Sequence, residues 1–250
     1  MLPETENIFW SFYHQSAKNN EKGHPPILWD VDLWPEQWKK IEYKTYDRFK
    51  KIPLPRRKKE QDFFELIKKR KSRRNFSSEP LGADEISMIL EYSCGITGPG
   101  SSDSFFHRAQ ASGGGRFPIE TYLFVHHGNE EIPGGVYHYG VERHELHTLW
   151  AHKFSPNEVN RYFMYPWAEC ASVSVLLTAV FERTMMKYGE RGYRYILLEA
   201  GHIGQNVYLV SEALGLKCCA LGGVRDTAIE ELLDIDTSKE SLVYSLAVGK

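Results

Sequence analysis

One long stretch of helical periodicity constrains the fold more than any other feature of the sequence. Between residues 193 and 214, apolar and small side chains recur every three or four positions, which is the spacing of one face of an α-helix. Gly215 follows the last repeat and is a typical helix end. We therefore predict a single long helix with one apolar face. Its repeating positions are Tyr193, Leu197, Ala200, Gly204, Val207, Ser211 and Leu214.

Shorter patterned segments surround this helix and indicate a fold of both helices and strands. Alternation of strands with helices predicts a mixed α/β or α+β sheet. Apolar runs bounded by turn residues predict strands over residues 119–126, 136–139, 172–181, 216–221 and 242–248. Helices are expected from about residue 60, over 83–93, after the capping sequence Ser155-Pro156-Asn157-Glu158, and over 228–233, with a Gly/Ser-rich loop over 95–104.

The N-terminal part differs from the rest because its tryptophans stand among polar and proline positions. We expect these aromatic side chains to lie across the main body, since leaving them in water would be costly. The stretch IPLPRRKK is interpreted as a turn and linker, with Pro53 and Pro55 preventing a helix. We predict an N-terminal extension over residues 1–58 and a main domain over residues 59–250. The tryptophans are Trp10, Trp29, Trp34 and Trp38.

No targeting or membrane segment is visible in the sequence. The first ten residues contain two acidic and no basic residues, unlike a signal peptide. The longest apolar stretch, residues 172–181, is too short to span a bilayer. The four cysteines form no CxxC pair, which favours a reduced compartment. We expect a cytoplasmic protein without a membrane partner.

Common nucleotide and metal motifs are missing from the sequence. Gly113-Gly114-Gly115 does not form GxGxxG, and there is no GxxxxGK[ST], so a Rossmann or P-loop enzyme is not expected. The histidines do not form HExxH or a Cys/His zinc spacing, so we predict no metal site.

A basic segment between Lys50 and Arg74 contains the first candidate site. It has twelve Lys or Arg against three Asp or Glu, although the whole chain carries a net charge of −2. Arg70, Ser72 and Arg74 alternate, so an extended backbone would direct two guanidiniums and a hydroxyl to one side, where they can hold a phosphate. Basic residues that complement a helix dipole and a nucleic-acid arm are the alternatives. A phosphate site for a small ligand is favoured, and no nucleic-acid partner is expected.

Two further segments are candidates for lining a site. In the sequence ASGGGRFPIE, three consecutive glycines let the backbone approach a flat ligand, although a plain flexible loop is equally compatible. The second segment starts at Lys187-Tyr188 and continues into the long helix. Its polar residues indicate either a lined cavity or a helix with one wet face. They are Glu199, His202, Gln205 and Asn206, with Gly201 among them.

Taken together, these segments resemble the nitroreductase superfamily, and more closely its SagB/ThcOx-type dehydrogenase branch. The resemblance covers most of the chain, and the order and spacing of the pieces make it specific. It implies an α+β sandwich with a central mixed or antiparallel sheet flanked by helices, and an intertwined homodimer with each flavin at the subunit interface. The pieces are Tyr13-His14, IPLP, RKSRRNF, SGGGRFPIE, GGVYHY, KYGERGYRYILLEAGHIGQN and the ALGG turn.

The resemblance also implies that the cofactor is FMN and which residues hold it. The arginine-serine-arginine segment would hold the phosphate, the serine-glycine loop would lie along the isoalloxazine ring, and the glycine pair of the ALGG turn would pack near the flavin. Ala111 is a departure, since many relatives have proline there. The residues so implied are Arg70, Lys71, Ser72 and Arg74, then Ser112, Gly113 and Gly114, then Gly222 and Gly223, with Gln205 from the long helix.

Members of this branch that mature thiazole- and oxazole-containing peptides use a lysine-tyrosine pair, which Lys187 and Tyr188 match by position. Desolvation and the cations Arg191 and Arg194 would lower the pKa of Lys187 toward neutrality and make it a usable base. We expect Lys187 to abstract an acidic ring proton and Tyr188 to assist or orient it. Surface and packing roles for the pair stay open as the alternative.

The predicted function is therefore FMN-dependent dehydrogenation of azoline (thiazoline or oxazoline) rings in a modified peptide, with a peptide substrate and cyclodehydratase partners. Dioxygen is expected to reoxidise the reduced flavin. One alternative is an NAD(P)H-dependent nitroreductase or quinone reductase on the same scaffold. Its bound flavin would be reduced rapidly by NADH or NADPH. Another is a non-catalytic flavin-binding scaffold in a peptide-modifying complex, against which the presence of Lys187-Tyr188 argues.

Overall fold

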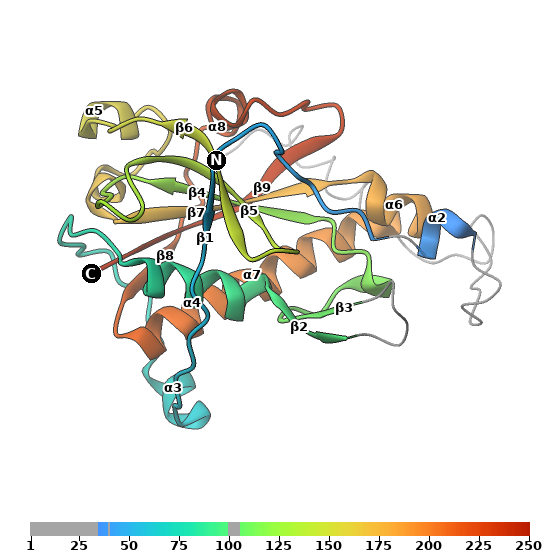
Figure 1. Cartoon of the computed structure of the whole chain (residues 1–250), viewed down its shortest axis with the longest axis horizontal. Coiled ribbons are helices and arrows are strands. Elements are labelled where there is room, and N and C mark those ends of the chain that lie inside the picture. The colour runs from blue at the N-terminus through green and yellow to red at the C-terminus, as the bar shows by residue number, and fades with distance from the viewer. Residues whose placement is uncertain (1–34, 40, 100–105) are drawn as a thin grey trace, which may run out of the picture.

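The fold is built on one sheet of seven strands in the order β1-β6-β5-β4-β7-β9-β8 (Figure 1). The computed structural model describes residues 35–39, 41–99 and 106–250. Every neighbouring pair in the sheet is antiparallel, which confirms the α+β class and excludes a mixed sheet. The strands are β1 (Lys51–Pro53), β4 (Ile119–Val125), β5 (Gly135–Gly140), β6 (Glu145–Ala151), β7 (Val173–Val180), β8 (Lys217–Ala220) and β9 (Glu240–Gly249), with a separate hairpin of β2 (Ile96–Pro99) and β3 (Phe106–Arg108).

Helices cover both faces of this sheet, so that the molecule has three layers. In Figure 1, α4 and α7 lie below the sheet, and α5 and α8 lie above it. Each face has its own apolar cluster, as expected for a sheet that is covered on both sides. The helices are α2 (Glu36–Lys39), α3 (Phe63–Lys69), α4 (Ala83–Cys94), α5 (Pro156–Val159), α6 (Glu182–Tyr188), α7 (Arg191–Leu214) and α8 (Asp226–Leu233), with 3-10 turns at Gly113–Gly115 and Pro166–Cys170.

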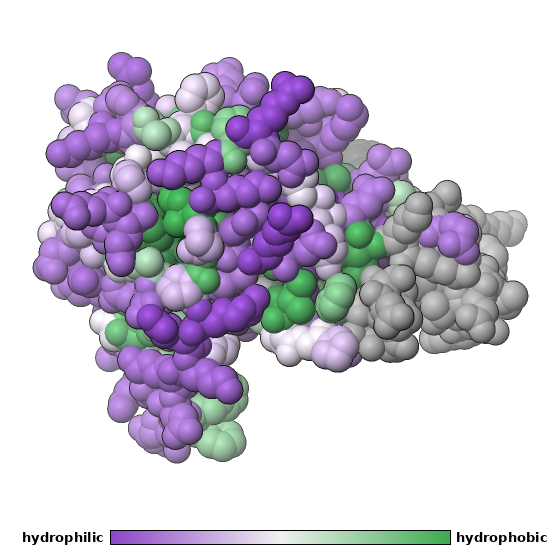
Figure 2. All heavy atoms as spheres, in the orientation of Figure 1, coloured by the Kyte–Doolittle hydropathy of each residue, from purple (hydrophilic) through white to green (hydrophobic). Residues whose placement is uncertain are grey.

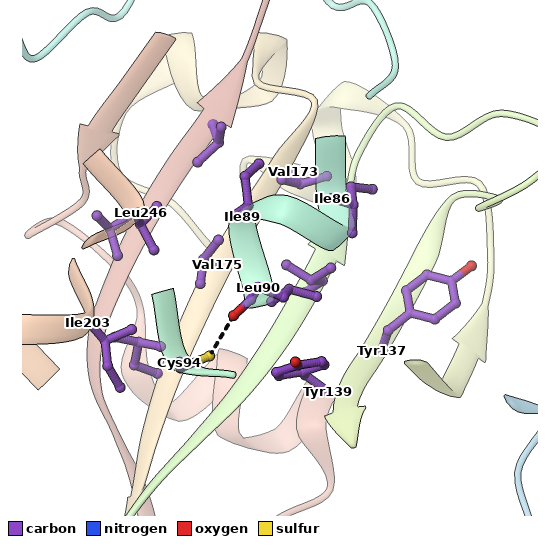
Figure 3. Packing of buried hydrophobic residues seen from close by; sticks show 14 of the residues in the cluster. Ile86, Ile89, Leu90, Cys94, Tyr137, Tyr139, Val173, Val175, Ile203 and Leu246 are labelled. Atoms are coloured by element: carbon purple, nitrogen blue, oxygen red, sulfur yellow. Dashed lines mark hydrogen bonds between the residues drawn. The ribbon is translucent and has the colours of Figure 1, made fainter. Parts of the chain in front are cut away.

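The core on the α4 side shows how the amphipathic pattern is used. Ile86, Ile89 and Leu90 of α4 belong to a buried cluster with Val173 of β7 and Leu246 of β9 (Figure 3). All five side chains are at most 2% exposed. Burying an aliphatic side chain of this size stabilises the fold by roughly 1.5–3 kcal/mol. This cluster fixes α4 and α7 against the sheet, and with them the segments at both ends of α7.

The long helix is confirmed, and its end follows the predicted glycine. Gly215 has a φ of 74°, and its N–H donates to the carbonyl of Glu212, while the N–H of Leu216 donates to the carbonyl of Ser211. This left-handed cap is open to glycine at little cost. Inside the helix, a Cβ at Gly204 would lie 2.3 Å from the Tyr244 ring, so glycine allows α7 to approach β9 closely.

The predicted apolar face of α7 is wrong in its first turns. Leu197 is 41% exposed and its neighbour Leu198 is 59% exposed, whereas Ile196 and Glu199 are buried. The periodicity locates a helical face but does not say which remote segment will cover it. Here a loop before β4 covers the face that carries Glu199.

Three other expectations need correction. The IPLPRRKK stretch is no plain linker, because its start lies in β1, where Ile52 pairs with Leu146 at the edge of the sheet. The strand β6 and the helix α6 were not predicted. The loop expected over residues 95–104 contains β2, which pairs with β3. The division at residue 58 stays a prediction.

Helices α2 and α3 lie at the periphery of the fold (Figure 1). Helix α3 begins at Phe63, with Asp62 as its N-cap, and none of its residues is buried. In the N-terminal extension, Trp38 of α2 is 9% exposed and packs on the main body, whereas Trp10, Trp29 and Trp34 lie outside the described residues. Within the described part of the chain, no helix is long and apolar enough to cross a membrane.

Candidate functional site

The glycine loop and the lysine-tyrosine pair meet at one point, although more than seventy residues separate them in sequence. Gly114 has a φ of 64°, and a Cβ there would lie 2.3 Å from Tyr188 Oη and 3.1 Å from Lys187 Nζ. A Cβ at Gly113 would lie 3.3 Å from the ring of Tyr195 in α7. We name Ser112, Gly113, Gly114, Lys187 and Tyr188 the loop cluster. Folding thus brings two of the three predicted segments together.

Three polar residues of α7, Glu199, His202 and Asn206, contact this loop. Asn206 Nδ2 donates to the carbonyl of Ala109 at 3.4 Å, and His202 Nδ1 lies 3.2 Å from the carbonyl of Ala111. Gln110 Nε2 donates to Glu199 Oε1 at 3.2 Å. The loop therefore runs antiparallel along α7, with its glycines at the N-terminal end of the helix. Polar side chains at helical spacing are explained by this contact.

Ser112 holds the turn that follows. Its Oγ accepts a hydrogen bond from the Phe117 N–H at 2.9 Å. The chain between them has positive φ at Gly114 and Gly115, and Phe117 itself has a φ of 46°, which a bulky residue rarely adopts. The serine and the glycines are therefore required for the shape of the loop, before any ligand is considered.

Lys187 lies in an environment that favours its neutral form. It is 9% exposed, and its Nζ lies 5.5 Å from the centre of the Trp38 ring. Burial, and secondly the charge of Arg116, lower the pKa of Lys187 to about 8. The expected cations Arg191 and Arg194 are thus not the cause. Burial also raises the pKa of Tyr188, which stays protonated near neutral pH.

Arg116 is a site residue that the sequence did not reveal. It is 5% exposed, its Nε donates to the carbonyl of Arg183 at 2.8 Å, and its Nη1 donates to the carbonyl of Trp38 at 2.5 Å. It therefore fixes both α2 and the start of α6 around Lys187. The only sequence signal was its place directly after the three glycines.

The predicted phosphate residues lie elsewhere, around Tyr208 of α7. The Arg70 guanidinium lies 5.2 Å from the centre of the Tyr208 ring. Ser72 Oγ is 3.0 Å from Tyr208 Oη, which also accepts a hydrogen bond from the Ala220 N–H at 2.7 Å. Tyr208 therefore connects this segment to the strand that precedes the ALGG turn. Arg73 forms an ion pair with Glu212, one turn further along α7.

Arg74 reaches the ALGG turn through two aromatic rings. Its guanidinium lies 5.9 Å from the centre of the Trp167 ring, which stacks on Tyr165 at 5.2 Å. A Cβ at Gly223 would lie 3.0 Å from the Tyr165 ring, whereas one at Gly222 would meet nothing within 4 Å. We name Arg70, Ser72, Arg74 and Gly223 the arginine cluster. Lys71, beside it in sequence, is exposed.

The two clusters occupy opposite ends of α7. Tyr195 contacts the loop cluster and Tyr208 contacts the arginine cluster, thirteen residues further along the same helix. Thirteen residues correspond to a rise of about 20 Å and a rotation of about 220°. One chain therefore does not gather all the predicted residues around one pocket. Gln205 is exposed between the clusters.

Each cluster fits one part of FMN. The arginine cluster offers two guanidiniums and a hydroxyl beside open space at Gly222, which suits a phosphate. In the loop cluster, backbone without side chains lies against Lys187 and Tyr188, which suits a flat ring. Among the described residues no group of His, Cys, Asp or Glu could hold a metal ion. The described chain thus has two partial sites on an α+β scaffold, one that suits a phosphate and one that suits a flat ring.

Comparison with known sequences gives the family. Residues 67–250 match the nitroreductase family, and the chain belongs to it. A protein of Methanocaldococcus jannaschii that carries a nitroreductase name, MJ1384, is 33% identical over 74% of this chain and 89% of its own length. Two relatives are peptide-processing proteins, which supports the SagB/ThcOx-type branch. The trifolitoxin-processing protein TfxB of Rhizobium leguminosarum is 30% identical over 68% of this chain, and the microcin B17-processing protein McbC of Escherichia coli is 28% identical over 52% of it. The matches cover 48% and 49% of those two proteins.

Solved structures confirm the fold. A crystal structure from Anabaena variabilis, also named as a nitroreductase, superposes with a TM-score of 0.73 at 25% identity, over 95% of this chain and 45% of that one. The E. coli microcin synthetase McbBCD complex with bound truncated pro-MccB17 matches with a TM-score of 0.60 at 20% identity, over 97% and 92%. A nitroreductase-type protein of Desulfovibrio desulfuricans in complex with FMN matches with a TM-score of 0.51 at 18% identity, over 76% and 87%.

Proposed function

We propose that this chain is an FMN-dependent dehydrogenase that oxidises azoline rings of a modified peptide to azoles. The single observation that carries the proposal is the buried Lys187 amine, whose pKa is lowered to about 8, directly beside the glycine loop. A base near neutrality at the bed of a flat redox cofactor is the arrangement that proton abstraction coupled to hydride transfer requires. The similarity to TfxB and McbC supports a peptide substrate.

The residues of the loop cluster divide this reaction between them. Bound FMN supplies the hydride acceptor. Neutral Lys187 takes the proton from the ring carbon of the substrate, and Arg116 favours that neutral form by its nearby charge. The Tyr188 hydroxyl, which stays protonated, orients the substrate by donating a hydrogen bond. Trp38 and the walls of the loop exclude water from the amine.

The assay for this function uses a synthetic peptide that contains one thiazoline. With FMN and dioxygen, the purified chain is expected to convert it to the thiazole, seen as the loss of two hydrogen atoms by mass spectrometry. If partners are required, a cyclodehydratase encoded nearby and its precursor peptide are added, as the McbBCD complex suggests. A fully loaded flavoprotein that leaves thiazoline and oxazoline peptides unchanged under all these conditions would contradict the proposal.

We also propose that the working unit is a homodimer in which each flavin is shared. Because the clusters of one chain lie at opposite ends of α7, the arginine cluster of one protomer would hold the phosphate and the loop cluster of its partner would bind the ring. Apolar side chains exposed around α7 and on the projecting α3 support such an interface (Figure 2). They are Phe63 (56% exposed), Phe64 (74%), Ile67 (48%), Leu197 (41%) and Leu198 (59%).

A mixed dimer tests the shared site directly. One protomer carries Arg70→Ala with Arg74→Ala and cannot hold the phosphate; the other carries Lys187→Ala and cannot supply the base. In a shared site, the flavin held by the second protomer faces the intact Lys187 of the first, so the mixture regains turnover up to one active site per dimer. Sites built within one protomer would give no recovery, because every flavin-loaded site would then lack Lys187.

An NAD(P)H-dependent nitroreductase is the second candidate, favoured by the similarity to MJ1384 over 89% of that protein. The two functions separate in a stopped-flow experiment on the loaded protein. Rapid bleaching of the flavin by NADH or NADPH would assign the second function. Slow bleaching by nicotinamides together with fast bleaching by an azoline peptide supports the dehydrogenase.

A further inference from the structure

Glu199 is a buried carboxyl that the reaction outlined above does not use. It lies in the middle of α7 and is only 2% exposed. Its carboxyl bonds both sides of Ala111 in the loop, since Gln110 Nε2 donates to it at 3.2 Å and the Ser112 hydroxyl is its second hydrogen-bond partner. It is thus attached to the residue that begins the glycine bed.

Burying an ionised carboxyl in this position is energetically unfavourable. Burying an ionised carboxylate costs several kcal/mol unless charges or hydrogen bonds compensate it. In the portion of the chain that the structure describes, no ion pair joins Glu199 to a cation. Burial raises the pKa of Glu199 to about 7, against the opposing effect of its hydrogen bonds and of more distant arginines. The groups that face it are Gln110 and Ser112 of the loop, Arg108 of β3, Arg183 of α6 and Cys94 of α4.

The contacts of Ser112 show what the carboxyl does. The Ser112 Oγ accepts from the Phe117 N–H at 2.9 Å, so its own proton is free to be donated to Glu199. The serine therefore connects α7 to the far side of the turn that contains Gly114. Because the turn has positive φ at three residues, it needs such external fixation to keep one shape.

We propose that Glu199 is a positioning residue for the flavin: its carboxyl holds the glycine loop in its bound shape, and its negative charge lowers the reduction potential of the ring lying on that loop. The second half rests on the proposed function, because it needs a flavin at the loop. The first half is a property of the chain alone. A lower potential follows because a fixed negative charge disfavours the addition of electrons to a nearby group.

Two variants separate the loop-holding role of Glu199 from the effect of its charge on the flavin. Glu199→Gln keeps an oxygen that can accept from Ser112 and removes the charge, whereas Glu199→Ala removes both. Glu190→Gln is the matched control, since it makes the same chemical change at an exposed carboxylate just before α7. Thermal melting of each variant first verifies that it is folded.

Hydrogen exchange of the apoprotein tests the holding role without flavin. We expect amides 109–117 to exchange at least about tenfold faster in Glu199→Ala and at unchanged rates in Glu199→Gln and Glu190→Gln. Unchanged exchange in a folded Glu199→Ala would overturn the holding role. This result stands even if the wild-type chain binds no FMN, which would instead refute the proposed function.

Spectroelectrochemistry of the FMN-loaded protein tests the role of the charge. At about pH 8.5, where the wild-type carboxyl is ionised, Glu199→Gln is expected to have the higher midpoint potential. At about pH 5.5, where the carboxyl is protonated, the two proteins should have the same potential. A merely structural residue would not give a difference that disappears on acidification. Equal potentials at both pH values, or a difference that persists at low pH, would overturn this part of the inference.

Discussion

The two ends of α7 carry the two halves of the candidate site, and they are built in different ways. At the N-terminal end, the loop cluster contains a buried amine: Lys187 is 9% exposed, although Gly114 is exposed, and the loop is bonded to α7 along its length. At the C-terminal end, Ser72 and Arg74 are exposed, and the arginines rest on the rings of Tyr208 and Trp167. Burial lowers the pKa of Lys187 at the first end, whereas the side chains at the second end are open to a ligand from solvent. This difference supports the proposal that the first end carries the chemistry and the second end anchors the phosphate.

The largest effect is expected at the anchoring end. Arg70→Ala with Arg74→Ala removes both guanidiniums, and each charge-assisted contact contributes about 1.5–3 kcal/mol. The affinity for FMN should fall by a factor of about a hundred to ten thousand, measured by quenching of FMN fluorescence. Lys58→Ala with Lys59→Ala makes a matched removal of two exposed charges nearby and should leave the affinity almost unchanged. Equal losses of FMN affinity in both double variants would mean that only the overall charge of the chain matters for binding.

The next effect is expected at the N-terminal end of α7, beside Lys187, and should separate turnover from FMN binding. Lys187→Ala removes the base, which typically costs at least about a hundredfold in rate. FMN affinity should change by less than about threefold, because the phosphate is held elsewhere. Azoline oxidation and flavin fluorescence, measured on the same preparation, check both halves. If Lys187→Ala released the flavin as completely as the double arginine variant, the two ends of α7 would not have separate roles in turnover and binding.

Glycine substitutions should also distinguish the ends. Gly114→Ala places a methyl group on Tyr188 Oη and forces an alanine to a φ of 64°, which costs about 1–3 kcal/mol of stability. Gly222→Ala meets nothing within 4 Å, so the folded chain should keep its melting temperature. If the flavin packs there as the family resemblance implies, this variant binds FMN more weakly even though its fold is intact. Calorimetry of both variants measures their thermal stability, and FMN titration measures their affinity for the cofactor.

The last expected effect is the pH dependence of turnover. Because the folded pKa of Lys187 is lowered to about 8, the neutral amine is a minor species at pH 6 and the major species at pH 9. Turnover should rise about tenfold per pH unit below pH 8 and level off above it. FMN affinity should show no matching rise, since Lys187 does not hold the phosphate in the proposed site. A rate that is flat from pH 6 to 9 would remove Lys187 from the rate-determining proton transfer.

Local patterns were sufficient to predict much of the fold. The periodicity of residues 193–214 and the following glycine predicted α7, and the capping box at Ser155 and Glu158 is present as expected. These features depend on contacts within a few residues. The strand β6 was missed because its sequence, ELHTLWA, gave no bounded apolar run, and its burial depends on its neighbours β1 and β5.

The candidate site was predictable only in pieces. The sequence indicated the residue types at both clusters, but not that Gly114 would lie against Lys187, or that Arg70 would contact the same helix about 20 Å further along. Glu199, His202 and Asn206 were interpreted as a possible cavity wall, because their partner, the loop before β4, is remote in sequence. The cation that affects Lys187 was assigned to its own helix region, although it comes from Arg116.

We expect this chain to bind FMN between the arginine cluster and the loop cluster. Titration of the purified, flavin-free protein into FMN, followed by fluorescence, tests it most directly. We expect quenching that saturates at one FMN per chain and a yellow protein after gel filtration. A colourless protein that leaves FMN fluorescence unchanged, at concentrations where it is folded and dimeric, would show that this chain does not bind FMN.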